Sequence, residues 1–258
     1  MAEVVLMTGA AGRIGQALRS RLARPGRTLR LLDVAPLGSA PDEEVVTASV
    51  TDPEAVSAAC AGVDAIVHLA GISGEASFER IQAVNVEGTR AVFEGAREHG
   101  VRRVVLASSN HAVGFQQRAS EPLPGDVPFA PDTWYGWSKT AIESMGALYH
   151  HRFGMDVVAL RIGTCAPKPG NVRALATWLS FDDCGRLVEA ALSAPSPGFR
   201  QVWGVSANTR RWWSLAEAEA LGYHPIDNAE AYAAEVADTG DYDVVGGPFT
   251  VTPLGDPL

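Results

Sequence analysis

The stretch Thr8-Gly9-Ala10-Ala11-Gly12-Arg13-Ile14-Gly15 follows a short apolar run at 3–7 and opens a helical pattern of apolar residues over 12–23. Glycines in a strand–loop–helix turn permit positive φ, close approach of the backbone to a pyrophosphate, and tight packing of the helix on the strand. The N-terminus of the helix adds unpaired N–H groups for an anion. The turn therefore predicts a dinucleotide site, and its expected contacts are Gly9, Gly12, Arg13, Ile14 and Gly15.

Strand-like and helix-like segments alternate after this turn. Apolar runs predict strands at 3–9, 28–34, 44–50, 64–71, 101–109, 155–163 and 199–207. Helical spacing predicts helices at 12–23, 52–62, 78–100, 135–154 and 181–195. Near-continuous apolar strands that alternate with helices are typical of a parallel sheet covered on both faces. We expect an α/β fold with a doubly wound parallel sheet of the Rossmann type, with a ligand crevice above the strand ends.

The pattern weakens after Thr164, where Pro, Gly and Trp become frequent. We therefore expect a dinucleotide-binding core over 1–165 and a small C-terminal substrate lobe with late sheet and helix elements over 166–258, in one compact unit. From Pro225 to the end there are seven acidic residues and no Lys or Arg. We expect this acidic tail to lie solvated on the surface and to bind nothing.

The composition narrows the class of protein. The chain has 258 residues, 47% of them hydrophobic, and a net charge of −9, which argues against nucleic acid or an anionic membrane as a partner. Three cysteines without CxxC spacing predict neither a zinc site nor a disulfide, and they favour the reducing cytoplasm. No run approaches the ~18 apolar residues of a membrane span, so we expect neither export nor membrane insertion.

Asp33 ends the second predicted strand, 18 residues beyond Gly15. A carboxylate at this place accepts hydrogen bonds from the adenosine ribose and repels a 2′-phosphate. Arg13 could attract such a phosphate, but the carboxylate should dominate. The expected cofactor is NAD.

Tyr135 and Lys139 open a predicted helix four residues apart, which places them on one face. A tyrosine has a reference pKa of ~10, and a nearby ammonium favours the phenolate. Tyr135 could then take a hydroxyl proton while hydride leaves the same carbon. The alternative is an amphipathic helix with an interfacial Tyr and a surface Lys.

The order of motifs resembles the extended short-chain dehydrogenase/reductases over roughly residues 3–165. The motifs are the glycine turn, HLAG at 68–71, NVEGT at 85–89, the serine pair at 108–109 and the Tyr135–Lys139 pair. The resemblance implies Tyr135 as the base, Lys139 as the modulator of its pKa and ribose anchor, and Ser109 as the hydroxyl that holds the reacting oxygen. It also places Leu69, Ala70 and Gly71 at the cofactor, and we expect Ser108 to close the strand.

A narrower resemblance covers nearly the whole chain. The segments 107–115, 135–139, 161–183 and 202–213 look like those of the uronate dehydrogenases. This family uses NAD to oxidise the C1 hydroxyl of glucuronate or galacturonate pyranose to an aldarolactone. The resemblance implies sugar contacts at Ser73, Ser109, Asn110, His111, Tyr135, Thr164 and Arg173. A guanidinium at Arg173 suits the sugar carboxylate because its planar fork matches carboxylate geometry.

One segment departs from that family. Ser49 and Val50 stand after the third strand, where the family often has an Asp followed by Leu near the adenine. We therefore expect the adenine to meet Ser49 and Val50, and we expect Asp52 to cap the next helix.

Two other functions remain open from the sequence. One is a nucleotide-sugar epimerase or reductase of the same superfamily, which would retain NAD tightly and need a larger C-terminal lobe. The other is a sensor that binds a dinucleotide without turnover, which would have no need of a Ser–Tyr–Lys set. By analogy with the superfamily we expect a homo-oligomer assembled through the helices at 78–100 and 135–154, and we expect no metal.

Overall fold

In the computed structural model, residues 3–119, 121–237 and 242–257 are described. Seven parallel strands form the central sheet, in the order β3-β2-β1-β4-β5-β6-β9. The strands are β1 (Glu3–Thr8), β2 (Arg27–Asp33), β3 (Glu43–Thr47), β4 (Ala65–His68), β5 (Arg103–Ser109), β6 (Asp156–Ile162) and β9 (Phe199–Gly204). The strand order reverses on either side of β1, as in a doubly wound sheet, so the expected fold is confirmed.

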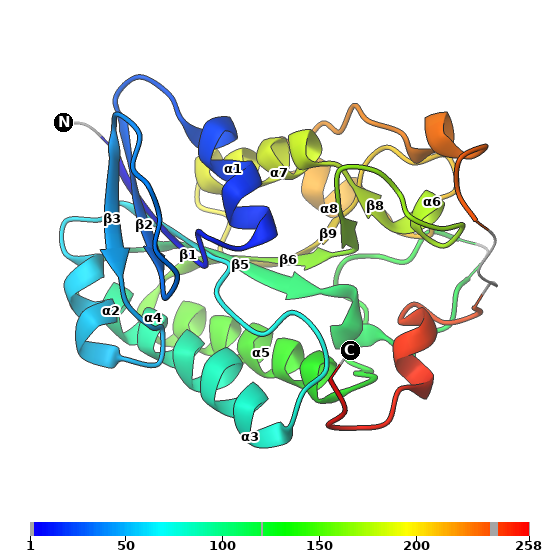
Figure 1. The fold of residues 1–258 in the computed structure, drawn as a ribbon, viewed down its shortest axis with the longest axis horizontal. Coiled ribbons are helices and arrows are strands. Elements are labelled where there is room, and N and C mark those ends of the chain that lie inside the picture. The colour runs from blue at the N-terminus through cyan, green and yellow to red at the C-terminus, as the bar shows by residue number, and fades with distance from the viewer. Residues whose placement is uncertain (1–2, 120, 238–241, 258) are drawn as a thin grey trace.

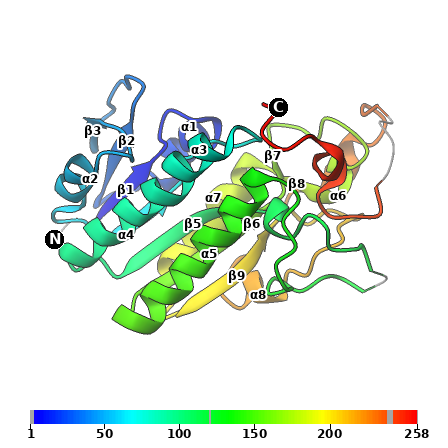
Figure 2. The same cartoon turned by 90° about the horizontal axis from the view of Figure 1, so that it is seen from below.

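Helices cover both faces of this sheet. The α-helices are α1 (Arg13–Leu22), α2 (Pro53–Cys60), α3 (Phe78–Ile81), α4 (Gly88–Glu98), α5 (Trp134–Phe153), α6 (Ala174–Thr177), α7 (Phe181–Ser193) and α8 (Ala216–Glu219). Figure 1 shows α1 and α7 on one side of the sheet, and α2, α4 and α5 on the other. Figure 2 shows α4 and α5 side by side across the sheet. The long apolar strands are buried on both sides as a result.

Local signals explain where the helices begin and end. Asp52 caps α2 by accepting from the amide of Ala55 at 3.1 Å, as expected. Thr133 caps α5 by accepting from Gly136 N at 3.0 Å. At its C-terminus, α5 ends at Gly154, whose φ of +68° is the left-handed conformation that favours glycine.

The predicted helix over 78–100 is continuous but not uniform. A π-helical turn, η1 (Gln82–Glu87), separates α3 from α4. Such turns are rare and occur often at functional sites. This turn places Asn85 in the interior, where it bonds the loop after β4.

The third strand is shorter than predicted, because residues 48–50 leave the sheet after Thr47. Val50 turns inward and packs on the backbone of α4, where a Cβ on Gly88 would lie 2.9 Å from Val50 Cγ2. The burial of Val50 therefore ends the strand and directs this segment toward the strand ends.

The second half adds α7 and β9 to the main sheet and a smaller layer beside it. That layer contains β7 (Thr164–Cys165) and β8 (Trp178–Leu179), which pair in parallel. Three 3₁₀ turns complete the described chain, η2 (Asn110–Val113), η3 (Ala229–Tyr232) and η4 (Gly247–Val251). The division into a core over 1–165 and a lobe over 166–258 stays a prediction.

The acidic tail lies only partly on the surface, so that expectation is wrong in part. Glu230, Glu235, Asp243 and Asp256 are exposed, but other residues of the segment are buried. Val245 is fully buried, and its amide donates to Gln116 O at 3.0 Å. Val245 belongs to the main apolar core, whereas Val251 and Leu254 are exposed; Figure 1 shows this C-terminal segment in red. Counting charges could not detect this burial. Residues 238–241, which carry two of the seven acidic side chains, lie outside the described part.

Candidate active site

Two adjoining cavities at the carboxyl ends of the strands form one cleft. Each has a volume of about 310 Å³, and they share Leu69, Gly71 and Ile72. We call them the dinucleotide cavity and the catalytic cavity. The first is bordered by Gly9, Gly12, Asp33, Ser49, Val50 and Ala70, together with Leu32, Val34, Ala48 and Val84. The cleft lies where a doubly wound sheet is expected to bind its ligand.

The glycine loop forms the floor of the dinucleotide cavity. Gly9 has a φ of +71°, and a Cβ there would lie 2.6 Å from Ala70 N. Gly15 does not border the cavity, but a Cβ there would lie 2.7 Å from Ala10 Cα, so this glycine permits α1 to pack on the loop. These glycines are therefore required by close backbone packing.

Asp33 supplies the carboxylate of the dinucleotide cavity. Its Oδ2 accepts from Ala11 N at 2.9 Å, which ties the end of β2 to the glycine loop. Ser49 and Val50 border the same cavity, and the Ser49 hydroxyl lies 2.7 Å from Thr51 Oγ1. A carboxylate for the ribose and an apolar wall for the base fit the adenosine half of NAD.

The catalytic cavity brings together the side chains that the sequence assigned to catalysis and substrate, with two that it assigned to the cofactor, Arg13 and Ile14. Its border includes Arg13, Ile14, Ser73, Ser109, Asn110, His111, Tyr135, Lys139, Thr164 and Arg173. Phe249 and Cys165 also border it, and neither was predicted. Phe249 could not be found from a motif, because it reaches the site only when the C-terminal segment folds back.

Tyr135 and Lys139 lie on one face of α5, as their spacing predicts. Lys139 Nζ is 5.5 Å from the centroid of the Tyr135 ring, and it donates to Ala107 O at 2.8 Å. Burial raises the pKa of Tyr135 to about 12, although a hydrogen bond with Ser109 acts in the opposite direction. Burial also lowers the pKa of Lys139 to about 8. Among the protein's own groups, desolvation thus outweighs the lowering of the Tyr135 pKa expected from the ammonium.

The two serines at the end of β5 have different environments. Ser109 Oγ accepts from His111 N at 3.2 Å and faces the catalytic cavity. Ser108 does not close the strand as expected, since its hydroxyl donates to the buried carboxylate of Glu143. Glu143 in turn is paired with Arg161 at 2.9 Å, and both side chains are fully buried. Ser108 is therefore part of a buried polar cluster.

Arg173 is a partly buried cation at the edge of the catalytic cavity. Its Nη2 donates to the backbone carbonyl of Val245 at 2.5 Å. Its Nε is buried and has no hydrogen-bond partner among the described residues. Burial lowers the pKa of this guanidinium to about 10. A carboxylate ligand would compensate this desolvated charge.

Two further polar residues hold the walls of the cleft, and neither was predicted as a site residue. Asn85 Oδ1 accepts from Ile72 N at 2.7 Å, and its Nδ2 donates to Ser138 Oγ at 3.0 Å. Glu75 accepts from Tyr135 N at 2.9 Å and from Gly255 N at 2.8 Å. Asn85 could have been found from the NVEGT motif that contains it. Glu75 could not, because its partners are distant in the sequence.

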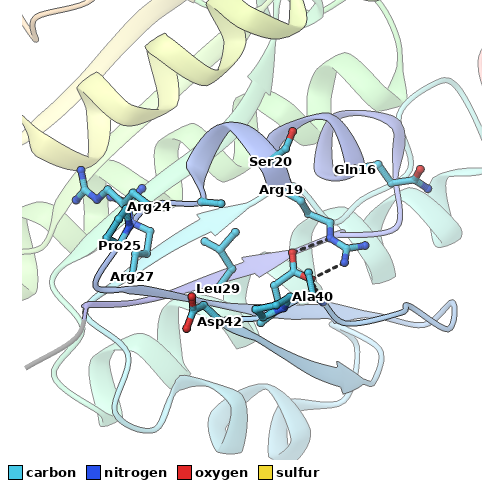
Figure 3. A pocket seen from close by; sticks show the side chains of 12 residues that line it. Gln16, Arg19, Ser20, Arg24, Pro25, Arg27, Leu29, Ala40 and Asp42 are labelled. Atoms are coloured by element: carbon cyan, nitrogen blue, oxygen red, sulfur yellow. Dashed lines mark hydrogen bonds and ion pairs between the residues drawn. The ribbon is translucent and has the colours of Figure 1, made fainter.

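A larger hollow lies away from the cleft, between α1 and the segment before β3 (Figure 3). Its volume is about 720 Å³. The arginines at its border are paired with carboxylates, such as Arg19 with Glu43 at 2.5 Å and Arg27 with Glu189 at 2.6 Å. The hollow contains neither the glycine loop nor Ser109, Tyr135 and Lys139, and carboxylates already neutralise its arginines, so it is not a candidate site.

Two negative findings apply to the described part of the chain. None of its helices is long and apolar enough to cross a membrane. It also contains no cluster of three or more His, Cys, Asp or Glu residues placed to hold a metal ion.

Comparison with known proteins agrees with this geometry. Residues 5–194 match the model of the NAD dependent epimerase/dehydratase family. Uronate dehydrogenase from Pseudomonas putida is 42% identical over 96% of this chain and 95% of its own. Uronate dehydrogenase from Agrobacterium fabrum is 45% identical over 91% of this chain and 89% of its own. The crystal structure of uronate dehydrogenase from Agrobacterium tumefaciens, a single-residue variant complexed with NAD, has a TM-score of 0.91 at 43% identity and covers 97% of this chain and 98% of that one.

The fold, the glycine loop and the family match define a member of the NAD dependent epimerase/dehydratase family. The similarity to individual relatives over nearly the whole chain identifies a narrower family within it. The chain belongs to the uronate dehydrogenase family, and the resemblance seen in the sequence is confirmed.

Proposed function

We propose that this protein oxidises the C1 hydroxyl of a hexuronate pyranose, D-glucuronate or D-galacturonate, to the aldarolactone. The observation that carries the proposal is Arg173, whose Nε is buried without a partner among the described residues, at the edge of a cavity that also holds Tyr135 and Ser109. Arg173 binds the sugar carboxylate, which fixes the sugar with its C1 hydroxyl between Ser109 and Tyr135. The remaining hydroxyls meet Ser73, Asn110, His111 and Thr164.

The protein's own residues then move one proton. Tyr135 accepts the proton of the C1 hydroxyl as C1 loses hydride, and a C1 carbonyl forms. Lys139, 5.5 Å from the tyrosine ring, stabilises the phenolate and anchors the nicotinamide ribose. Asp33 binds the adenosine ribose, and Gly9 and Gly12 admit the pyrophosphate. Bound NAD supplies the hydride acceptor, and the positive charge of its oxidised ring favours the phenolate.

The test is NADH formation by the purified protein with each uronate. We expect turnover with both sugar acids and loss of turnover in Tyr135→Phe, while NAD binding persists. Tyr149→Phe is the matched control, because Tyr149 lies on the same helix but bonds Glu94 outside the cleft. Failure to oxidise either uronate, together with turnover of another alcohol, would contradict the proposal.

The purified protein also distinguishes the two alternative functions. Stoichiometric NAD in the purified protein would favour the nucleotide-sugar epimerase or reductase. Binding of NAD without turnover of any sugar would favour the sensor.

We also propose that the enzyme works as a homo-oligomer in the cytoplasm. Leu148 and Phe153 are large apolar side chains exposed on α5, one of the two helices expected at the interface. The three cysteines are free and buried, which suits a reducing compartment. Light scattering of the purified protein and of a Leu148→Glu variant tests the assembly.

A further inference from the structure

A carboxylate lies behind the imidazole of His111, and it belongs to none of the sequence motifs. Asp132 Oδ2 is 2.6 Å from His111 Nδ1, and the Asp132 side chain is fully enclosed. We propose that Asp132 is a positioning residue that holds His111 with its Nε2 as a hydrogen-bond acceptor for one hydroxyl of the sugar. The proposal rests on the proposed function, and it assigns Asp132 a part in selecting the sugar.

The tautomer follows from the hydrogen bond. An ionised carboxylate can only accept, so Nδ1 of His111 must carry the proton that joins the two side chains. In a neutral imidazole, Nε2 then keeps its lone pair. His111 borders the catalytic cavity, and no described residue forms a hydrogen bond with Nε2. A sugar hydroxyl is the group that can donate to it there.

The imidazole is held on three sides, which fixes the orientation of the ring. Phe249 stacks on its face with ring centroids 3.9 Å apart and an angle of 24°. The Tyr135 ring contacts it edge to face at 5.8 Å. Asp132 fixes the third side. A ring turned over would place Cδ2 against Asp132 in place of Nδ1 and lose this hydrogen bond.

Asp132 itself is enclosed by three glycines from separate parts of the chain. A Cβ on Gly114, Gly136 or Gly246 would overlap the Asp132 carboxylate. Thr133 Oγ1 donates to the other carboxylate oxygen at 3.0 Å. The absence of three side chains therefore makes room for this carboxylate and prevents its rotation.

Asp132 also attracts the nearby Arg173 electrostatically. If this attraction were the main role of Asp132, the KM of the variant Asp132→Asn would change in the opposite direction. Loss of a negative charge beside the carboxylate site should strengthen binding of an anionic sugar. Loss of a correctly oriented acceptor should weaken it. The direction of the change in KM thus separates the two effects.

The experiment compares Asp132→Asn, His111→Gln and the double variant. In Asp132→Asn the amide can donate to Nδ1, so Nε2 becomes a donor that faces the sugar hydroxyl's hydrogen. We expect KM for the uronate to rise about tenfold or more, with a smaller change in kcat and an unchanged Kd for NAD. In the His111→Gln background the same substitution should change kcat/KM by less than about twofold, because Asp132 acts through His111. Asp126→Asn, an exposed residue of the preceding loop, is the control.

Imidazole ¹⁵N NMR gives a second readout that a purely structural role would not change. The spectrum of His111→Gln assigns the resonances. We expect a protonated Nδ1 and an unprotonated Nε2 in the wild type, and the reverse in Asp132→Asn. A protonated Nε2 in the wild type would overturn the proposal even if the variant fails to fold. An unchanged or lowered KM, or an equal loss in both backgrounds, would also overturn it. A wild type that oxidises no uronate contradicts the proposed function, while the tautomer still decides the role of Asp132.

Discussion

Arg173 donates from Nη2 to the backbone carbonyl of Val245 at 2.5 Å, which joins the candidate carboxylate site to the C-terminal segment. The same carbonyl accepts from Asn110 Nδ2 at 3.2 Å. Two side chains assigned to the sugar are therefore held by one backbone group far along the chain. The C-terminal segment shapes the substrate end of the cleft and does not merely cover it.

The first prediction concerns the guanidinium of Arg173. Arg173→Lys should raise KM for the uronate by about 30-fold or more, since truncating a buried charged hydrogen-bonding partner costs about 2–5 kcal/mol. The lysine keeps the charge but loses the planar fork. Initial rates with glucuronate and galacturonate measure the effect, and the Kd for NAD should stay unchanged.

A neutral sugar provides the control for this substitution. Galactose has no carboxylate, so any turnover of galactose should fall no further in Arg173→Lys. Arg210→Lys, on an exposed arginine that pairs with Glu230, should leave the uronate KM as it is. Equal losses on galactose and galacturonate would show that Arg173 acts on the structure of the cleft and not on the carboxylate.

Features whose interacting residues are close together in the sequence could be predicted from it. The glycine loop, the capped helix at Asp52 and the Tyr135–Lys139 pair depend on neighbours within about one turn or one loop, so local patterns predict them. The parallel strands follow from their apolar runs. The cleft then follows from topology, since all strands of a parallel sheet end at the same edge.

The features that the sequence did not predict depend on contacts between segments that are distant in the chain. Phe249 stacks on His111, and Glu75 accepts from Gly255, and neither pairing leaves a periodic trace in the sequence. The acidic tail was expected to be fully solvated because net charge reports nothing about the burial of Val245. Ser108 was mistaken for a strand end because its partner, Glu143, lies on another element.

The second prediction concerns the glycine that contacts Arg173. Gly247 has a φ of +59°, and a Cβ there would lie 2.6 Å from Arg173 Nε. Gly247→Ala should therefore displace the guanidinium and raise the uronate KM, with little change in NAD binding. Gly255→Ala is the matched control, since its φ of +88° carries similar strain but its nearest neighbour is 4.0 Å away. Similar kinetics in the two variants would exclude a specific contact with Arg173.

The third prediction concerns the choice of NAD over NADP. Asp33→Ser should raise the ratio of kcat/KM for NADP to that for NAD by about tenfold or more, because the repulsion of a 2′-phosphate by the carboxylate is removed. The absolute activity with NAD should fall, since Asp33 also holds Ala11 N at 2.9 Å. Asp52→Ser keeps a capping hydroxyl at α2 and should leave the ratio unchanged. A ratio unchanged in Asp33→Ser would place the discrimination elsewhere.

The fourth prediction concerns pH. Oxidation requires the Tyr135 phenolate, and with a pKa of about 12 its population rises with pH throughout the neutral range. It also requires the Lys139 ammonium, whose pKa of about 8 means that the charge is lost above that pH. Plots of kcat/KM against pH should therefore rise toward pH 8 and then level off. In Lys139→Met the rate should be lower and the levelling near pH 8 should disappear.

The last prediction concerns acid stability and His68. This histidine is fully buried between Thr8 Oγ1, 2.7 Å from Nδ1, and Thr89 Oγ1, 2.9 Å from Nε2. Burial lowers its pKa from 6.5 to about 3. The native state therefore binds fewer protons than the unfolded state between pH 3 and 6.5, so the free energy of unfolding falls as pH falls through 6.5.

The size of this effect can be measured against matched variants. His68 alone should reduce the free energy of unfolding by about 1.4 kcal/mol between roughly pH 7.5 and 5.5, because one more proton binds to the unfolded chain. Urea unfolding at both pH values measures it. His68→Gln should be less stable at both pH values, because the glutamine cannot bridge both threonines in the same geometry. The free energy of unfolding of this variant should depend less on pH, by the contribution of that one proton. His224→Gln, which alters an exposed histidine, should keep the wild-type dependence. If His68→Gln also keeps the wild-type pH dependence, then His68 becomes protonated in the native state in mild acid, and the bridge between the two threonines must open there.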